Sequence, residues 1–489
     1  MKMTTTLTRA TRLVARQYVT RATTSSTKAA RFISTNTDTV CELASSNLRY
    51  GIGATSEVGQ DLKEQFACEK AIVFTDKFIR QQDCFQTLIK AFENNNVNYT
   101  IYDQVRVEPT NQSFQNAIDF LENEVDDYDA VVAMGGGSVM DTAKAANLYA
   151  CQSHPVHFYD YVNPPIGRGM PVVDKILKPL IAIPTTAGTG SETTGVAIFD
   201  DIPTRSKTGI ASRQLKPTLG IVDPLNTMSL PRKVAIYSGL DVLCHAMESY
   251  TALPYKQRPK PTSPLQRPAY QGSNPISDVW SLFALETAAK YLPIAVSETV
   301  DPDIKRAAQE KMILASSAAG IGFGNAGVHL CHGCSYPIAA QVKDSYIGKA
   351  YDFITDHALI PHGLSVIVTA PSVFTWTSVA CPDRHRTCAQ ILQSARWSIE
   401  QHGGENGTIQ VPPTTTAGSD PGLWLADEIR HICSTLDVQT GLKQFDYTVD
   451  DIPSLVDGTL PQHRVTKISP RPIQQRADLE NLFLAALDE

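Results

Sequence analysis

The stretch DAVVAMGGGSVMDTAKAANLYA (129–150) decides the fold of this 489-residue chain. An apolar strand is expected over 129–134, and a helix is expected after the glycines, with Ser138 placed to cap it. Glycines let the backbone pass close to a ligand, and a helix N-terminus offers free N–H groups to a pyrophosphate. The run Gly135, Gly136, Gly137, Ser138 lacks the G-x-G-x-x-G spacing and alone could be only a tight turn. We interpret it as a nucleotide-binding loop.

The surrounding sequence repeats this strand–helix alternation. Strands are expected over 71–76 and 99–105, and helices over 77–94 and 111–123. Such alternation predicts an α/β fold, a doubly wound parallel sheet with helices on both faces.

A second loop, LIAIPTTAGTGSETT (180–194), follows another apolar strand. It is dense in hydroxyls, supplied by Thr185, Thr186, Thr189 and Ser191. Two such loops at the carboxyl ends of strands match the place where ligands bind in open α/β sheets.

Three acidic or basic residues near these loops are further candidates for cofactor binding. Asp76 ends a strand, where a carboxylate binds a ribose hydroxyl and favours NAD over NADP; it could instead cap a turn. Asp141 lies in the first turn of the helix, where the helix dipole alone would favour it. Lys207 could reach a phosphate or be solvated.

Beyond residue 224 the sequence becomes mostly helical. Helices are expected over 231–252, 278–298, 303–322, 364–379 and 385–402. Three stretches here carry scarce ligand types: GLDVLCHAMESY (239–250), HLCHGCSYP (329–337) and LIPHGLS (359–365).

These stretches contribute Asp241, His245, His332 and His362. Asp241 and His245 are four positions apart and share one helix face. One carboxylate and three imidazoles suit Fe²⁺ or Zn²⁺. A capping Asp beside a core His is the structural alternative.

Length and charge bound the remaining possibilities. A chain of this length predicts more than one domain, and its net charge of −7 argues against a nucleic-acid surface. Residues 1–37 hold seven basic residues and no acid, which is typical of a mitochondrial transit peptide and makes the remainder more acidic, at about −14. We expect a transit peptide over 1–37, a dinucleotide-binding domain over 38–226 and a helical metal and substrate domain over 227–489.

Three other features invite an interpretation. The uncharged run 312–342 is broken by polar residues and glycines, so a buried helix is favoured over a membrane span. The proline-rich loop 254–278 carries Arg258, Lys260 and Arg267, which could form an anion-binding lid or a solvated loop. The ten cysteines are expected to be reduced thiols, including the pair Cys331 and Cys334.

The segments GGGSVMD, TTAGTGSE, GLDVLCHAMESY and PHGLS resemble, in the same order, motifs of the iron-containing (group III) alcohol dehydrogenase family. The likeness extends from about residue 47 to the end. It implies a dinucleotide-binding α/β domain followed by an α-helical metal domain, bound NAD, and a divalent metal with Fe²⁺ favoured over Zn²⁺. The implied metal ligands are Asp241, His245, His332 and His362. The implied cofactor contacts are Asp76, Gly135 to Ser138, Asp141, Thr185, Thr186 and Lys207.

Within that family, GVHLCHGCSYP and RPAYQGSNPISD are similar to the mitochondrial hydroxyacid-oxoacid transhydrogenase branch. The resemblance implies oxidation of 4-hydroxybutyrate to succinic semialdehyde, tightly held NAD, and reduction of 2-oxoglutarate to 2-hydroxyglutarate in the mitochondrial matrix. Tyr336 stands where many members have a proton-relaying His, and a phenol is a poorer base at neutral pH. Tyr336 and Arg267 are the candidate catalytic residues.

Other functions stay open at this stage. An ordinary NAD-dependent alcohol dehydrogenase would release its NADH, a dehydroquinate-synthase type of lyase shares the architecture, and a non-catalytic binding protein would lack the metal. We expect small hydroxyacids and oxoacids as partners, a possible homo-oligomer, and neither nucleic acid nor membrane.

Overall fold

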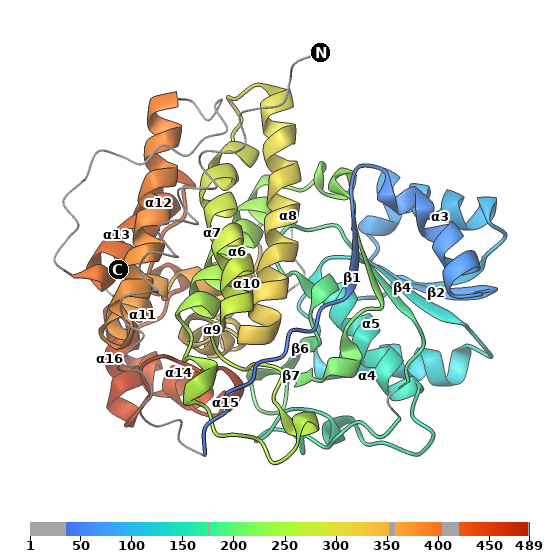
Figure 1. Cartoon of the computed structure of the whole chain (residues 1–489), viewed down its shortest axis with the longest axis horizontal. Helices are drawn as coiled ribbons and strands as arrows, with labels where there is room; N and C mark the ends of the chain where they lie inside the picture. Colours follow the sequence, from blue (N-terminus) through green and yellow to red (C-terminus); the bar gives the residue numbers. More distant parts are fainter. Residues whose placement is uncertain (1–35, 175, 352–356, 403–419, 488) are drawn as a thin grey trace, which may run out of the picture.

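The computed structural model describes residues 36–174, 176–351, 357–402, 420–487 and 489. All but the last two residues of the expected transit peptide lie outside this range. Figure 1 shows two parts side by side, a sheet with its covering helices and a larger assembly of helices.

The first part is built on six parallel strands in the order β1-β8-β5-β4-β2-β3. Their bounds are β1 Asn47–Tyr50, β2 Lys70–Phe74, β3 Asn98–Tyr102, β4 Ala130–Gly135, β5 Leu180–Pro184 and β8 Leu219–Val222. β4 and β5 are buried throughout, as apolar runs in a parallel sheet covered on both faces must be.

Alternate side chains of each strand enter opposite cores, because successive residues of a strand point to opposite faces. Ile72 of β2 packs in the core under α4 (Asn111–Asp119) and α5 (Gly137–Ala150), whereas Val73 packs in the core under α3 (Asp83–Asn94). The predicted doubly wound sheet is therefore confirmed.

Two details differ from the prediction. The helix expected over 77–94 begins only at Asp83, because Asp76 Oδ1 accepts the amides of Phe78 and Ile79 and turns the chain first. An antiparallel hairpin, β6 (Val196–Asp201) with β7 (Ser206–Ala211), was not predicted. It carries Lys207.

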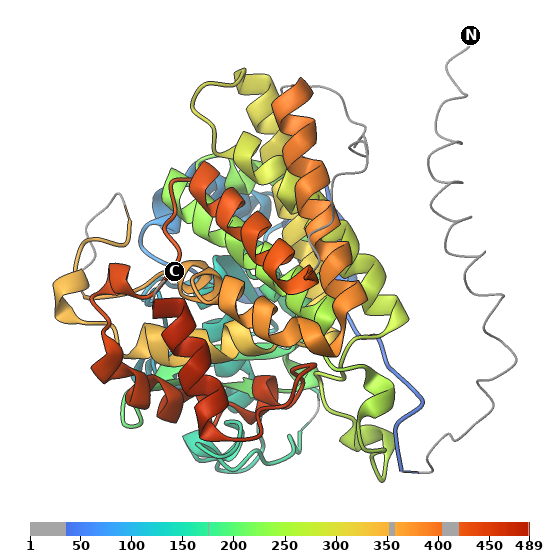
Figure 2. The same cartoon turned by 90° about the vertical axis from the view of Figure 1, so that its left-hand side faces the viewer.

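The second part is helical, as predicted. Its longer helices are α6 Arg232–Thr251, α7 Pro275–Ala295, α8 Pro302–Ala326, α9 Leu330–Ala340, α12 Pro382–His402, α13 Pro421–Thr435 and α16 Arg476–Leu487; the shorter ones are α10 His362–Ile367, α11 Ala370–Thr377, α14 Ile452–Thr459 and α15 His463–Thr466. The helix expected over 364–379 is split into α10 and α11, and Pro371, which has no N–H to donate, lies in the first turn of α11. Figure 2 views this helical part from the front, with the C-terminal helices nearest in orange and red.

Helix α8 lies between the other helices and the sheet (Figure 1). Its small residues allow a close approach: the backbone at Gly320 of α8 meets Gly190 of the second loop so closely that a methyl group on Gly320 would lie 2.7 Å from the Gly190 oxygen. Ser317 of α8 donates to Glu192 of the same loop at 2.6 Å. The uncharged run 312–342 thus lies partly at this interface. Within the described residues, no helix meets the length and apolarity that a membrane span requires.

Candidate metal centre and nucleotide loops

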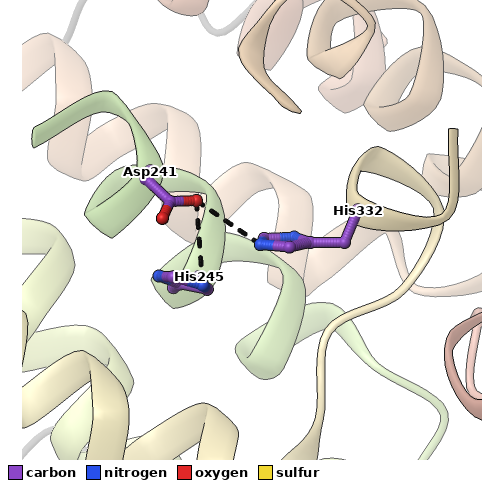
Figure 3. Close-up of side chains that lie close together, drawn as sticks. All are labelled: Asp241, His245 and His332. Carbon is purple, nitrogen blue, oxygen red and sulfur yellow. Dashed lines mark ion pairs between the residues drawn. The ribbon is translucent and has the colours of Figure 1, made fainter. Parts of the chain in front are cut away.

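Asp241, His245 and His332 converge although they come from two separate helices (Figure 3). The i, i+4 spacing on α6 places Asp241 Oδ1 3.7 Å from His245 Nε2, and α9 brings His332 Nε2 to 3.4 Å from the same oxygen. One ligand atom from each residue lies within 4.8 Å of the others, and the three side chains are buried. The structure therefore unites three of the four predicted ligands.

His362, the fourth predicted ligand, lies slightly farther out. It begins α10, its Nε2 is 3.9 Å from Asp241 Oδ1, and its ring centroid is 5.4 Å from that of His332. Its side chain is 26% exposed, against 3–5% for the other three. His362 thus borders the cluster on its open side.

The polar atoms of this cluster lack partners. Asp241 Oδ1, His245 Nδ1, His332 Nε2 and His362 Nδ1 are buried without a hydrogen bond to any described residue. A buried polar atom left unsatisfied costs about 1–3 kcal/mol. Asp241 Oδ1 and His332 Nε2 face each other at 3.4 Å, and this unsatisfied pair indicates an absent ligand. One carboxylate and several imidazoles are the donor set of a divalent first-row cation, and they fit that role here.

His245 and Asp241 are already in the forms that bind metal. Burial lowers the pKa of His245 to about 3, so the ring is neutral and keeps a lone pair at neutral pH. Burial acts to raise the pKa of Asp241, but the neighbouring imidazoles of His245 and His362 outweigh it and lower that pKa. A carboxylate and a neutral imidazole are the forms that bind metal. Burial acts to lower the pKa of His332, but Glu248 and Asp241 outweigh it and raise that pKa, so this ring must lose a proton when a cation binds.

Glu248, which the sequence reasoning missed, holds His332 in place. Its Oε2 accepts a hydrogen bond from His332 Nδ1, and its Oε1 accepts the amides of His329 at 3.0 Å and Cys331 at 2.7 Å. The bond at Nδ1 fixes the tautomer and leaves Nε2 facing Asp241. Glu248 lies three residues after His245 on the same helix, but that spacing alone does not show that it meets His332 of α9.

The two predicted nucleotide loops lie against each other at the ends of β4 and β5. Thr185 N donates to Gly135 O at 3.0 Å. A methyl group on Gly137 would lie 2.7 Å from Thr189 Cγ2, and one on Gly136 would lie 3.3 Å from Thr186 Cγ2. Only glycine fits this contact without displacement, so the glycines serve loop packing as well as backbone access.

Asp141 and Ser191 join these loops from within. Asp141 accepts from Ser191 Oγ at 2.7 Å and from Ile198 N at 2.9 Å. The buried amine of Lys144 donates to Ser191 Oγ at 2.6 Å. Both predicted residues are therefore engaged in a bridge between loops, which orients the loops rather than leaving these side chains free.

Three other predicted cofactor residues have partners that the sequence did not reveal. Ser138 does not cap α5: Gly136 holds the N-cap position, and Ser138 Oγ accepts from Glu108 N at 3.2 Å. Asp76 caps a turn through Oδ1, the alternative weighed above. Lys207 is buried and ion-pairs with Glu108 and, at 3.7 Å, with Asp200, so it is not a solvated residue.

Arg267 is satisfied by the chain's own carboxylates. It donates to Asp38 at 2.9 Å and to Glu42 at 3.3 Å, and Asp38 N also donates to Arg258 O. Of the three basic residues of this loop, Arg267 is therefore already neutralised by carboxylates of the segment before β1. That segment could not be anticipated from sequence spacing, because Asp38 lies 229 positions from Arg267.

Tyr336, the other candidate catalytic residue, is buried on α9 one turn beyond His332. Its hydroxyl accepts a hydrogen bond from Arg464 Nη2 at 2.6 Å. Arg464 was not predicted, because it lies on the short helix α15 outside every motif. Cys331 and Cys334 are free thiols, as predicted, and all ten cysteines are unpaired.

Comparisons with known proteins agree over most of the chain. A family model described as "Iron-containing alcohol dehydrogenase" matches residues 45–224, and one described as "Fe-containing alcohol dehydrogenase family, C-terminal" matches residues 269–487. The mitochondrial hydroxyacid-oxoacid transhydrogenase of Rattus norvegicus is 52% identical over 452 residues, covering 92% of this chain and 90% of the relative. A probable mitochondrial hydroxyacid-oxoacid transhydrogenase of Dictyostelium discoideum is 46% identical and covers 92% of this chain and 79% of the relative.

Solved structures share the fold. A 1,3-propanediol oxidoreductase aligns with a TM-score of 0.71 at 22% identity, covering 92% of this chain and 100% of that one. A sulfoacetaldehyde reductase from Bifidobacterium kashiwanohense, in complex with NAD⁺, aligns with a TM-score of 0.67 at 26% identity, covering 92% and 99%.

Proposed function

We propose a function on an established premise: this chain belongs to the iron-containing alcohol dehydrogenase family. It is an oxidoreductase, and we assign it hydroxyacid-oxoacid transhydrogenase activity in the mitochondrial matrix. The names of its 46–52% identical relatives support the activity and the location. The observation that carries the proposal is the buried group Asp241, His245 and His332 with unsatisfied ligand atoms.

The metal ligands follow from that group. Asp241, His245, His332 and His362 would hold a divalent cation, with Fe²⁺ favoured by the family description. When bound, the cation supplies Lewis-acid polarisation of the reacting carbon–oxygen bond, and the nicotinamide accepts and returns the hydride.

The chain's own residues supply position. The amides at the start of α5 and in the loop 185–191 bind the pyrophosphate of NAD, as helix N-termini do. Glu248 keeps His332 Nε2 turned toward Asp241, and Phe323 lies flat on the His245 ring at 4.0 Å and keeps water from that side. Holding groups in reactive positions lowers the barrier because orientation is already established.

The proposed reaction consumes no nucleotide. 4-Hydroxybutyrate loses a hydride and a proton and becomes succinic semialdehyde; 2-oxoglutarate gains both and becomes 2-hydroxyglutarate. NAD stays bound between the two half-reactions, and the acids are the chain's partners. A homo-oligomer stays a prediction.

The test is turnover without added nucleotide. Purified, metal-loaded protein is given both acids, the two products are measured, and the nucleotide released on denaturation is identified by mass spectrometry. We expect both products in equal amounts and NAD(H) in the denatured sample. Turnover that requires added NAD⁺ in amounts equal to product would instead indicate an ordinary alcohol dehydrogenase that releases NADH.

A further inference from the structure

Arg464 carries a buried donor without an acceptor. Its Nη2 donates to Tyr336 Oη, and its guanidinium lies 4.8 Å from the centre of the Tyr270 ring. Its Nη1 is shielded from solvent and has no hydrogen-bond partner among the described residues. A guanidinium is always charged and cannot accept a hydrogen bond, so only an acceptor brought from outside can satisfy Nη1.

The surroundings of Arg464 are apolar. Tyr270, Phe323, Val328, Tyr336 and Ile468 form an apolar cluster there. No carboxylate of the described residues lies within ion-pair distance of Arg464, whereas Lys207 is paired with Glu108 and Arg267 with Asp38. Arg464 as a whole is half-buried, but Nη1 lies in its shielded part, where a polar donor normally has an acceptor.

Arg464 lies close to the predicted metal ligands. Tyr336, which it contacts, follows His332 by four residues on α9, about 6 Å along the helix and on the same face. Phe323 stacks on His245 and belongs to the apolar cluster around Tyr336. The guanidinium therefore contacts a side chain that lies one helical turn from the predicted metal ligand His332.

We propose that Arg464, together with the hydroxyl of Tyr336, binds the carboxylate of the substrate. Tyr336 accepts from Arg464, so its own proton stays available to donate, and Nη1 supplies a second donor. Tyr336 then positions and selects the substrate rather than carrying the reaction's proton. The inference deepens the proposed function and rests on it.

One anchor suits both substrates. In 4-hydroxybutyrate the carboxylate lies three carbon–carbon bonds from the carbinol carbon, and in 2-oxoglutarate the distal carboxylate lies three carbon–carbon bonds from the keto carbon. Because the acids occupy the site in turn, a single guanidinium at a fixed distance serves both half-reactions. It also sets chain length, since a shorter acid cannot place both ends at once.

The test compares two hydride acceptors that differ only at the distal end, where 2-oxoglutarate has a carboxylate and 2-oxopentanoate has a methyl group. 2-Oxoglutarate and 2-oxopentanoate are given to wild type and Arg464→Met with 4-hydroxybutyrate held saturating for each protein. We expect the ratio of kcat/KM for 2-oxoglutarate over 2-oxopentanoate to fall about 100-fold in Arg464→Met, mainly through the KM for 2-oxoglutarate. Arg464→Lys keeps the positive charge but loses the planar pair of N–H donors of the guanidinium, so it should show an intermediate ratio. An unchanged ratio overturns the proposal.

Two controls keep the test decisive. Arg476→Met removes an exposed arginine paired with Asp457 and Glu480 and should leave the ratio unchanged. Tyr336→Phe should lower the same ratio about 10-fold; a proton carrier would instead reduce turnover of both acceptors equally. If Arg464→Met melts at a lower temperature than wild type, the proposal is judged on Tyr336→Phe instead, by its ratio of kcat/KM for 2-oxoglutarate over 2-oxopentanoate.

A binding measurement with an unreactive acid tests the role of Arg464 independently of the proposed transhydrogenase activity. Glutarate, which cannot react, is titrated calorimetrically into wild type and Arg464→Met. Wild-type binding that is lost in Arg464→Met supports the anchor even if no transhydrogenation is seen, and a wild type without transhydrogenation contradicts only the proposed function. Equal glutarate binding by both proteins contradicts the anchor.

Discussion

Glu248 shows at the scale of a residue how a side chain without substrate contact controls a ligand. It is fully buried, and its two oxygens accept different hydrogen bonds: one from His332 Nδ1 and the other from the amides of His329 and Cys331. Histidine is scarce in this chain, with eleven residues, and Asp241 stands four positions before His245, so Asp241, His245 and His332 could be predicted to meet. The role of Glu248 depends on where α9 lies, which no local spacing gives, so Glu248 could not be predicted.

Replacing Glu248 by Gln tests that control. The amide nitrogen would face either His332 Nδ1–H or the two backbone amides, and donors would then oppose donors. We expect a 10- to 100-fold weaker affinity for Fe²⁺ or Zn²⁺, as for other partners of metal-binding histidines, measured by competition with a chromogenic chelator.

The matched control is Glu286→Gln, at an exposed site on α7, which should leave the affinity unchanged. A Glu248→Gln protein with wild-type metal affinity and an unaltered melting temperature would show that Glu248 does not orient His332.

At the scale of elements, the helices and strands that local sequence patterns mark could be predicted, and those that depend on contacts distant in sequence could not. β4 and β5 can be recognised from the local sequence, because each is an apolar run of strand length that ends at a glycine or a polar loop. The hairpin β6–β7 is stabilised by Asp141 and Lys207, whose partners are distant in sequence, and no local pattern marks it. The sequence left the basic loop 254–278 open between an anion-binding lid and a solvated loop for the same reason, because Asp38 and Glu42 reach Arg267 from the other end of the chain.

The contact between the two nucleotide loops gives an element-scale prediction. Gly137→Ala would place a methyl group 2.7 Å from Thr189 Cγ2, and relieving that overlap moves the loops apart at a cost of about 1–3 kcal/mol. We expect about 10-fold weaker NAD⁺ binding and less nucleotide retained per mole of purified protein.

The double variant Gly137→Ala, Thr189→Ser removes the obstructing methyl group and should recover most of the loss. Coupling of this kind is expected only between residues in contact. If the single variant retains as much nucleotide as wild type, the spacing of these loops does not govern cofactor binding.

At the scale of the whole molecule, the sheet part and the helical part meet without side chains between them at one point. Gly190, with φ +56°, and Gly320 of α8 touch backbone to backbone, and the buried Glu192–Ser317 hydrogen bond lies beside them. The loop that we propose to bind the cofactor belongs to the first part, and the proposed metal ligands belong to the second. This contact therefore fixes the distance between the two halves of the reaction site.

A methyl group at Gly320 tests this coupling, and a second glycine of the same helix is the control. In Gly320→Ala the new carbon would lie 2.3 Å from Thr193 Oγ1 and 2.7 Å from Gly190 O, and a backbone atom cannot rotate away. We expect the free energy of unfolding to fall by about 1–3 kcal/mol, the Tm to fall by about 2–5 °C, and less nucleotide to be retained.

In Gly324→Ala the nearest contact is Thr194 Cγ2 at 3.4 Å, which is ordinary van der Waals distance, and alanine favours helix by up to about 1 kcal/mol. Its Tm should equal or exceed that of wild type in the same calorimetric scan, with full nucleotide retention. Equal behaviour of the two variants would mean that the halves are not held together through this contact.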